Sequence, residues 1–413
     1  MSKDRKNRTA SAGPWIREDR MPSLDEITWL RSAEGHAVCA AMAGDSPANT
    51  PAAITRWRER LEPGQVTVAW QQVLFRRSAR AKFSRADLML FDRVALEQAT
   101  DEVLARHKAK RFQDRSRIAD FCCGIGGDAL ALAEIASVTA IDWSAARAAM
   151  AEHNACIYGN RIDILIEDAR IARPEADAAH IDPDRRPAGG RKHRIEQSSP
   201  GPEVLRQIVD RYQNVAAKLS PGADFENLPF DAEIELISHR GECKQAVAWT
   251  GALRQARRRA TAFPSGESIT AGPEEDLLWP PSAAIRPGTL LFEPDAAVIR
   301  ANLVGVLARQ YQLNPIDPHI ACLVGETLPQ TTLLAAFRVL EVSNWSTALG
   351  RQMLARHDVG HVDIKTRGFA GKPEEVLKCL HPRGTHSATL LLTRIGDRPT
   401  AILAERVPPQ PNP

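Results

Sequence analysis

The chain has 413 residues, of which 43% are hydrophobic and 25% are charged, and this composition excludes a wholly disordered protein. Its 54 basic and 51 acidic residues leave a net charge of +3, so the overall charge does not identify a nucleic-acid-binding protein. We expect two or three domains, no membrane span, no secretory signal and a cytoplasmic location, because apolar runs are short and the seven cysteines form no Cys-x-x-Cys pair.

The first part of the chain has a helical pattern. Residues 1–22 are polar and show no apolar period, so we interpret them as a disordered tail. Apolar residues at helical spacing predict an N-terminal helical domain over residues 23–112. Near its end a basic face carries Arg93, Arg106 and Lys108, which we interpret as solvated surface.

Between residues 113 and 270 short apolar runs alternate with amphipathic segments, which is typical of a parallel sheet with crossover helices. Predicted strands cover residues 118–122, 138–142, 162–166 and 178–182, with further strand regions at 218–224, 233–238 and 243–249. Helices are expected at residues 128–136, 145–158 and 204–217.

The remainder predicts a connecting segment and a second small domain. Residues 271–329 begin with many prolines and glycines, and we interpret them as a linker with one short helix. A small α/β domain is expected over residues 330–408. Its predicted strands are 337–341, 362–365 and 389–394, and its predicted helices are 348–355 and 374–380.

The segment from Asp120 to Asp128 reads Asp-Phe-Cys-Cys-Gly-Ile-Gly-Gly-Asp and joins an apolar strand to a helix. Its glycines allow a tight turn that approaches a ligand closely, although purely structural turns use glycine as well. Acidic residues also follow the next two strands, Asp142 and Asp168, as expected for a nucleoside bound at this sheet edge. Because a carboxylate at Asp128 is a poor neighbour for pyrophosphate and a good one for an ammonium group, we expect S-adenosylmethionine rather than NAD.

The fourth predicted strand ends in Asp182-Pro183-Asp184-Arg185. We expect the Asp182 carboxylate to accept hydrogen bonds from a substrate amine and so aim its nitrogen at the sulfonium methyl group. The alternative is a plain Asp-Pro turn. The basic run in residues 185–194 is expected to hold nucleic-acid phosphates, with a solvated surface as its alternative.

These motifs resemble class I S-adenosylmethionine-dependent methyltransferases, and most of the chain resembles bacterial members with a C-terminal THUMP-like domain. The segments that carry the wider resemblance are residues 96–100, 105–107, 218–222, 235–241, 291–295, 298–301 and 364–368. The glycine loop is also similar to that of trimethylguanosine synthase. The resemblance implies a Rossmann-like seven-stranded α/β core, flanked by the N-terminal helical domain and the small C-terminal α/β domain.

The resemblance also implies the cofactor S-adenosyl-L-methionine and a set of site residues. Asp120 and the glycines would contact its methionine part, Asp142 the ribose and Asp168 the adenine edge. The predicted cofactor-binding set is Asp120, Cys122, Gly124, Gly126, Gly127, Asp128, Asp142, Trp143, Asp168 and Ala169. The predicted catalytic residues are Asp182, Pro183, Asp184 and Arg185, and no metal is expected.

The implied function is methylation of a nucleobase nitrogen, with guanine as one candidate, in an RNA that is either tRNA or rRNA. Enzymes of this kind usually carry an aromatic residue just after the Asp-Pro, and this chain has none there. Two alternatives therefore stay open: a methyltransferase acting on a small molecule or a protein, and a catalytically silent RNA-binding protein. The sequence gives no indication of the oligomeric state.

Overall fold

The computed structural model describes residues 20–44, 50–184, 198–272 and 280–408. The chain forms two compact units, the first built mainly from residues up to Lys218 and the second mainly from residues after Arg254. Most of the predicted tail and the basic run after Asp184 lie outside the described residues. Within the described ranges, no helix is long and apolar enough to cross a membrane. The five-segment division of the chain stays a prediction.

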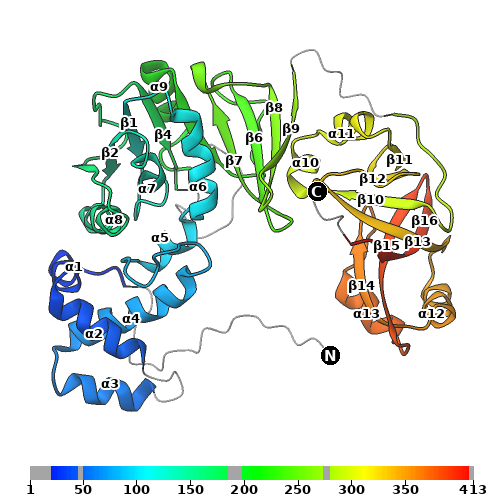
Figure 1. Cartoon of the computed structure of the whole chain (residues 1–413), viewed down its shortest axis with the longest axis horizontal. Coiled ribbons are helices and arrows are strands. Elements are labelled where there is room, and N and C mark those ends of the chain that lie inside the picture. Colours follow the sequence, from blue (N-terminus) through cyan, green and yellow to red (C-terminus); the bar gives the residue numbers. More distant parts are fainter. Residues whose placement is uncertain (1–19, 45–49, 185–197, 273–279, 409–413) are drawn as a thin grey trace. The chain divides into compact units, whose positions relative to one another are not determined.

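The first unit begins with six helices, shown in blue to cyan in Figure 1. They are α1 (Leu24–Leu30), α2 (Ala33–Ala43), α3 (Thr50–Arg58), α4 (Pro63–Ala79), α5 (Arg93–Gln98) and α6 (Glu102–Ala109). Local sequence explains several helix starts: Ser23 and Glu26 form a capping box before α1, and Asp92 accepts a hydrogen bond from the Ala95 amide at the start of α5. The helix α5 ends at Gln98, and the short connection to α6 reaches the site described below.

Five parallel strands follow, in the spatial order β3-β2-β1-β4-β5. Their bounds are β1 (Arg117–Phe121), β2 (Ser137–Asp142), β3 (Asp163–Ile166), β4 (Ala178–Ile181) and β5 (Val215–Leu219). The helices between them are α7 (Ala129–Leu132), α8 (Ala145–Ile157) and α9 (Pro202–Tyr212). The strand order reverses between β1 and β4, which is where a doubly wound sheet binds its ligand. The predicted Rossmann-like class is therefore confirmed.

Two predicted boundaries in this sheet are wrong. The helix expected at residues 204–217 ends at Tyr212, and the strand expected from Lys218 already begins at Val215. The run Val215-Ala216-Ala217 favours a helix by its alanines, but all five residues of β5 are buried. A strand that is covered on both faces has no alternating pattern, so periodicity alone does not distinguish it from a buried helix.

The second unit starts with four strands in the order β7-β6-β8-β9, shown in green in Figure 1. They are β6 (Glu233–His239), β7 (Glu242–Trp249), β8 (Arg258–Phe263) and β9 (Glu267–Ala271). The strands β6 and β7 are antiparallel, β6 and β8 are parallel, and β8 and β9 are antiparallel. The strands β1–β7 are thus the seven that were expected in chain order, and β8 and β9 are additional.

The rest of the second unit is a seven-stranded sheet with the order β11-β12-β10-β13-β16-β15-β14. Its strands are β10 (Leu290–Pro294), β11 (Asn314–Asp317), β12 (Ile320–Gly325), β13 (Leu334–Asn344), β14 (Val359–Thr366), β15 (His386–Ile395) and β16 (Arg398–Arg406). Its helices are α10 (Ala296–Arg300), α11 (Val304–Gln310), α12 (Thr347–Arg356) and α13 (Pro373–Leu380). Within residues 271–329, predicted as a linker with one short helix, the structure has β10, β11 and β12, which belong to the same sheet as the C-terminal strands.

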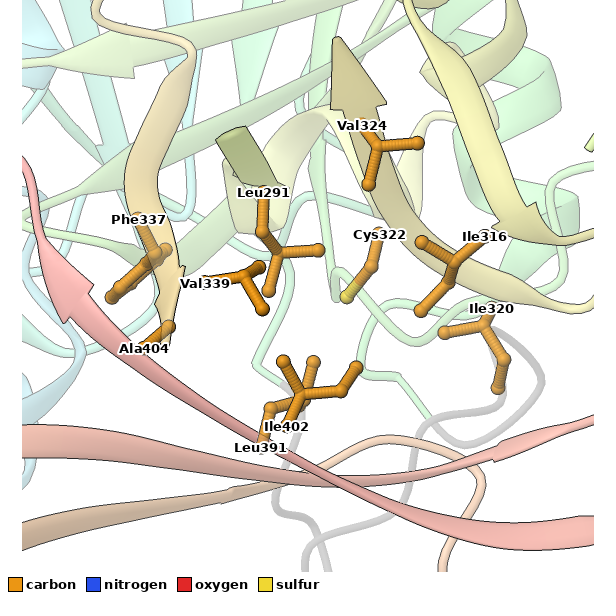
Figure 2. Close-up of a cluster of buried hydrophobic side chains, with 10 residues drawn as sticks. All are labelled: Leu291, Ile316, Ile320, Cys322, Val324, Phe337, Val339, Leu391, Ile402 and Ala404. Carbon is orange, nitrogen blue, oxygen red and sulfur yellow. The ribbon is translucent and has the colours of Figure 1, made fainter. Parts of the chain in front are cut away.

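Both faces of this sheet are buried. Along β15, Leu391 belongs to one hydrophobic cluster, while its neighbours Leu390 and Leu392 belong to another. Figure 2 shows the first cluster, in which side chains from β10–β13, β15 and β16 point toward one another. The second cluster packs against α12 and α13. This alternation, with a period of two residues, is what specifies the strand register.

Candidate active site

A cavity of ≈ 590 Å³ lies in the first unit, at the carboxyl ends of β1, β2 and β4. Most of the predicted site residues come together around it. Those that line the cavity are Asp120, Cys122, Gly124, Gly127, Asp128, Asp142, Trp143, Asp168, Ala169, Asp182, Pro183 and Asp184. Gly126 supports the turn without lining the cavity, and Arg185 lies outside the described residues.

The glycine turn after β1 requires its glycines for two different reasons. Gly126 has φ +88°, and a Cβ atom at this position would lie 3.3 Å from the Ala151 Cβ of α8. Gly127 has an ordinary φ, but a Cβ there would lie 3.3 Å from the backbone nitrogen of Thr100. The turn is thus packed against α8 on one side and against the α5–α6 connection on the other, which leaves its ligand-facing edge open.

Two acids stand at the cavity where a nucleoside would lie. Asp142 accepts hydrogen bonds from the Gly124 amide at 2.9 Å and the Ser144 amide at 2.8 Å. Burial raises the pKa of Asp142, and these two amides partly oppose the shift. Asp168 is held by the Arg170 guanidinium, whose hydrogen bonds lower the pKa of Asp168. Both carboxylates are therefore fixed in orientation.

Two further cavity residues differ in exposure and chemistry. Trp143, directly after Asp142, keeps 74% of its surface exposed and offers an aromatic face to the cavity. Cys122 has φ +58°, a conformation that residues other than glycine rarely adopt. Burial raises the pKa of the Cys122 thiol well above its ordinary value, so this cysteine is a neutral wall residue rather than a nucleophile.

A row of buried polar side chains runs beneath the turn. Asp120 Oδ1 lies 2.7 Å from His180 Nδ1, and His180 Nε2 lies 3.3 Å from Lys108 Nζ. Lys108 Nζ lies 2.6 Å from Asp128 Oδ1, and Asp128 Oδ2 accepts a hydrogen bond from the Thr100 hydroxyl at 2.8 Å. Asp128 was predicted to be a neighbour of the ligand's ammonium group, and in the structure it pairs with an ammonium group of the chain itself, that of Lys108.

The prediction of a solvated basic face near residue 108 is wrong for Lys108. Its side chain is buried, with a relative exposure of 1%, because it points inward to Asp128. Burial lowers the pKa of Lys108, and the nearby Asp128 opposes the shift. Burial of Asp128 acts to raise its pKa. The nearby positive charges, that of Lys108 above all, outweigh the effect of burial, so the pKa of Asp128 falls below its ordinary value.

The Asp-Pro segment is held by side chains from other parts of the first unit. Lys218 Nζ of β5 lies 2.5 Å from Asp182 Oδ2 and also donates to the Thr100 hydroxyl at 2.9 Å. Gln98 Nε2 donates to Asp184 Oδ1 at 2.9 Å. Since no described residue donates to Asp182 Oδ1, one oxygen of this carboxylate remains for a ligand.

The residues that orient these acids were not predicted as site residues from the sequence. They are Gln98, Thr100, Lys108 and Lys218. His180 was interpreted from the sequence as a satisfied core residue, and in the structure it contacts Asp120. Gln98 and Thr100 line the cavity because α5 stops at Gln98. Residues 96–100 and 218–222 did carry part of the family resemblance, and this was the one available signal that they serve the site.

The residues fit a cofactor with a cationic amino-acid part and a ribose. Asp120 Oδ2 is buried and accepts no hydrogen bond from any described residue. A buried carboxylate oxygen without a donor is costly, so this atom needs a donor from a ligand. The cavity contains no comparable cluster of cations for a pyrophosphate among its described lining residues, where Arg147 and Arg170 each pair with an aspartate.

Three family models match separate parts of the chain. Residues 23–79 match a domain of unknown function, residues 115–180 match the RNA cap guanine-N2 methyltransferase model, and residues 334–406 match the THUMP domain-like model. The second match spans the strands β1–β4, up to His180. The third coincides with β13–β16 and the helices between them.

Similar proteins support the same family. An uncharacterized S-adenosylmethionine-dependent methyltransferase from two strains of Mycobacterium tuberculosis is 37% identical over 317 residues, which cover 74% of this chain and 85% of the relative. A crystal structure from Porphyromonas gingivalis W83, of a protein assigned as a methyltransferase, has a TM-score of 0.75 at 20% identity. The similarity covers 94% of this chain and 100% of that chain, and at this identity it concerns the fold.

Proposed function

Because the chain belongs to the S-adenosylmethionine-dependent methyltransferases, with S-adenosylmethionine as its cofactor, we propose that it methylates a nitrogen of an RNA base. One observation carries the proposal: the segment that matches the RNA cap guanine-N2 methyltransferase model, residues 115–180, supplies much of the cavity wall. The THUMP domain-like match supports RNA as the partner, by analogy with domains associated with RNA binding. Guanine in tRNA or rRNA, and a cytoplasmic location, belong to the same proposal.

The cofactor, when bound, supplies an electrophilic methyl group on a sulfonium. In our proposal the ammonium group lies against Asp120, the ribose hydroxyls against Asp142, and the adenine edge against Asp168. The backbone around Gly124 and Gly127 can approach the ligand closely, because the turn is packed from behind. These contacts place the methionine end of the ligand beside Asp182, which lines the same cavity.

Asp182 is proposed to orient the acceptor nitrogen. Its Oδ2 is held by Lys218, so its Oδ1 is left to accept an N–H from the substrate amine. With that hydrogen bond made, the nitrogen lone pair turns toward the methyl group, which is catalysis by positioning. On transfer the acceptor nitrogen would gain the bond to the methyl carbon as the carbon–sulfur bond breaks with its electron pair left on sulfur, and the nitrogen would then give up one proton to solvent. Trp143 offers an exposed aromatic face at the cavity, where the Asp-Pro segment itself has none.

Mass spectrometry of modified nucleosides tests the proposal. RNA from a strain lacking this gene should lack one methylated nucleoside, and the purified full chain with labelled cofactor should restore it. The variant Asp182→Asn should restore it at least about 100-fold more slowly, since it removes the charge that orients the amine. Unchanged RNA in the deletion strain, or label that enters only a small molecule or a protein, would overturn the proposal.

A further inference from the structure

Two side chains beneath the glycine turn take no part in the mechanism above, although they are among the most buried polar groups of the described chain. Lys108 of α6 and His180 of β4 each have a relative exposure of 1%. Burying an ammonium group and an imidazole costs free energy unless each has partners. His180 contacts Asp120 directly, and Lys108 contacts His180. Asp120 lines the cavity and is the acid proposed above to face the amino-acid part of the cofactor.

The distances fix the direction of the hydrogen bonds. An ammonium group has only donors, so at 3.3 Å Lys108 Nζ can bond His180 Nε2 only if that nitrogen carries a lone pair. The proton of a neutral ring then sits on Nδ1, which donates to Asp120 Oδ1 at 2.7 Å. A doubly protonated ring would face the Lys108 ammonium with a like charge, and Asp128 Oδ2 is farther from Nε2, at 3.7 Å.

These hydrogen bonds, from Lys108 to His180 and from His180 to Asp120, engage one carboxylate oxygen of Asp120 and leave the other without a donor among the described residues. Oδ1 is occupied by His180, which fixes the rotation of the carboxylate. Oδ2 is buried and accepts no hydrogen bond from any described residue, and Asp120 lines the cavity. Burial raises the pKa of Asp120, and the His180 contact opposes the shift. Oδ2 is therefore the oxygen of Asp120 that is left to accept a hydrogen bond from a ligand.

We propose that Lys108 and His180 are positioning residues for the cofactor, which hold Asp120 so that its Oδ2 receives the ammonium group of S-adenosylmethionine. Lys108 comes from the helical segment before the sheet and lies outside all three family-model matches. The cofactor site thus depends on α6 as well as on the glycine motif. This inference concerns the cofactor alone and does not depend on the acceptor being RNA.

Calorimetry with two ligands separates positioning from general stability. S-adenosylhomocysteine carries the ammonium group, whereas 5′-methylthioadenosine has the same nucleoside without the amino-acid part. In Lys108→Met of the full chain, affinity for S-adenosylhomocysteine should fall about 10-fold or more, as for a lost charge-assisted contact, with 5′-methylthioadenosine unchanged within about 2-fold. Lys244→Met is the matched control, because Lys244 also pairs with a carboxylate, that of Glu242 at 2.5 Å, but is exposed.

A pair of variants at His180 gives an independent comparison. Asparagine can still donate to Asp120 from the position of Nδ1, while leucine cannot, so His180→Asn should keep the preference for S-adenosylhomocysteine and His180→Leu should lose it. Equal losses for both ligands, or no loss in any variant, would overturn the proposal.

The wild-type chain provides a readout that needs no folded variant. Nitrogen-15 NMR of histidine-labelled protein at neutral pH should show the His180 ring protonated at Nδ1 and bare at Nε2. A His180 ring that carries its proton on Nε2, or protons on both nitrogens, would contradict the proposed hydrogen bonds from Lys108 to His180 and from His180 to Asp120, independently of the results with the variants.

Discussion

Two buried lysines each pair with an aspartate that lines the cavity. Lysine is almost never fully buried without a partner, and here Lys108 pairs with Asp128 and Lys218 with Asp182. The Thr100 hydroxyl joins the two pairs, since it accepts from Lys218 and donates to Asp128. At the residue scale, the site is therefore one polar network in which the cofactor side and the substrate side share a side chain.

Lys218→Met tests the substrate side of this network. Without the ammonium group, Asp182 is free to rotate, and we expect kcat to fall about 100-fold while the cofactor Kd changes less than about 3-fold. In an Asp182→Asn background the same substitution should have little further effect, because Lys218 acts through Asp182. Single-turnover rates of the single and double variants, measured with the same RNA acceptor, test the two rate effects. Additive losses in the double variant would show that Lys218 has another role.

At the scale of elements, α8 connects the glycine turn to the helical segment. Its residue Asn154 accepts from the Leu90 amide and donates to the Leu90 and Ile125 carbonyls. About two turns earlier, Arg147 pairs with Asp92, which caps α5. These buried contacts hold α5 and its following connection against the cavity, so that Gln98 and Thr100 reach the aspartates.

The histidine His153 makes α8 sensitive to acid. Its Nε2 lies 3.1 Å from the Leu88 carbonyl, and burial lowers the pKa of His153 to about 4. Between that value and the ordinary pKa of about 6.5, the unfolded chain binds more protons than the folded chain. This histidine's contribution to stability is therefore present above about pH 6.5 and is lost as the pH falls toward 4.

Hydrogen exchange in α8 checks this expectation. Protection of α8 amides should decrease when the pH falls from 7 to 5, after correction for the intrinsic exchange rate. His153→Gln should remove most of that dependence, because a glutamine amide does not titrate. His386→Gln, at an exposed position of the second unit, serves as the control. A pH dependence that persists in His153→Gln would assign the effect to another group.

At the scale of the whole molecule, the family-model matches do not contain the complete site. Residues 23–79, 115–180 and 334–406 match, while the cavity also uses residues 95–100, 182–184 and 199–201. The second unit carries a cavity of its own, ≈ 640 Å³, lined by Arg351, His381 and Arg383 among others. Basic side chains around a cavity in a THUMP-like domain are suited to contact phosphates.

Replacement of Arg351 and Arg383 by alanine tests whether the second unit contributes to RNA binding. We expect weaker binding of total tRNA and rRNA, with the slope of log K against log salt reduced by about 1.5, corresponding to two phosphate contacts. The cofactor Kd should not change, because these residues are remote in sequence and belong to the other unit. Arg394→Ala, exposed on β15 of the same unit, is the control. An unchanged salt slope would exclude this surface.

The fold class, the cofactor class and the acids that line the cavity could be predicted from the amino-acid sequence alone. These were predictable because parallel strands end at one edge of a sheet, so Asp120, Asp142 and Asp182 had to lie near one another once their strands were recognised. Which basic residues orient those acids became visible only in the three-dimensional arrangement of the chain. Lys108 and Lys218 lie 110 residues apart and look like ordinary surface lysines in sequence, and a single chain contains no periodic signal for a non-local ion pair. The strand β10 was missed for the same reason, since it pairs with β12 and β13 rather than with a segment next to it in the sequence, whereas β11 and β12 pair locally and were missed because they are short.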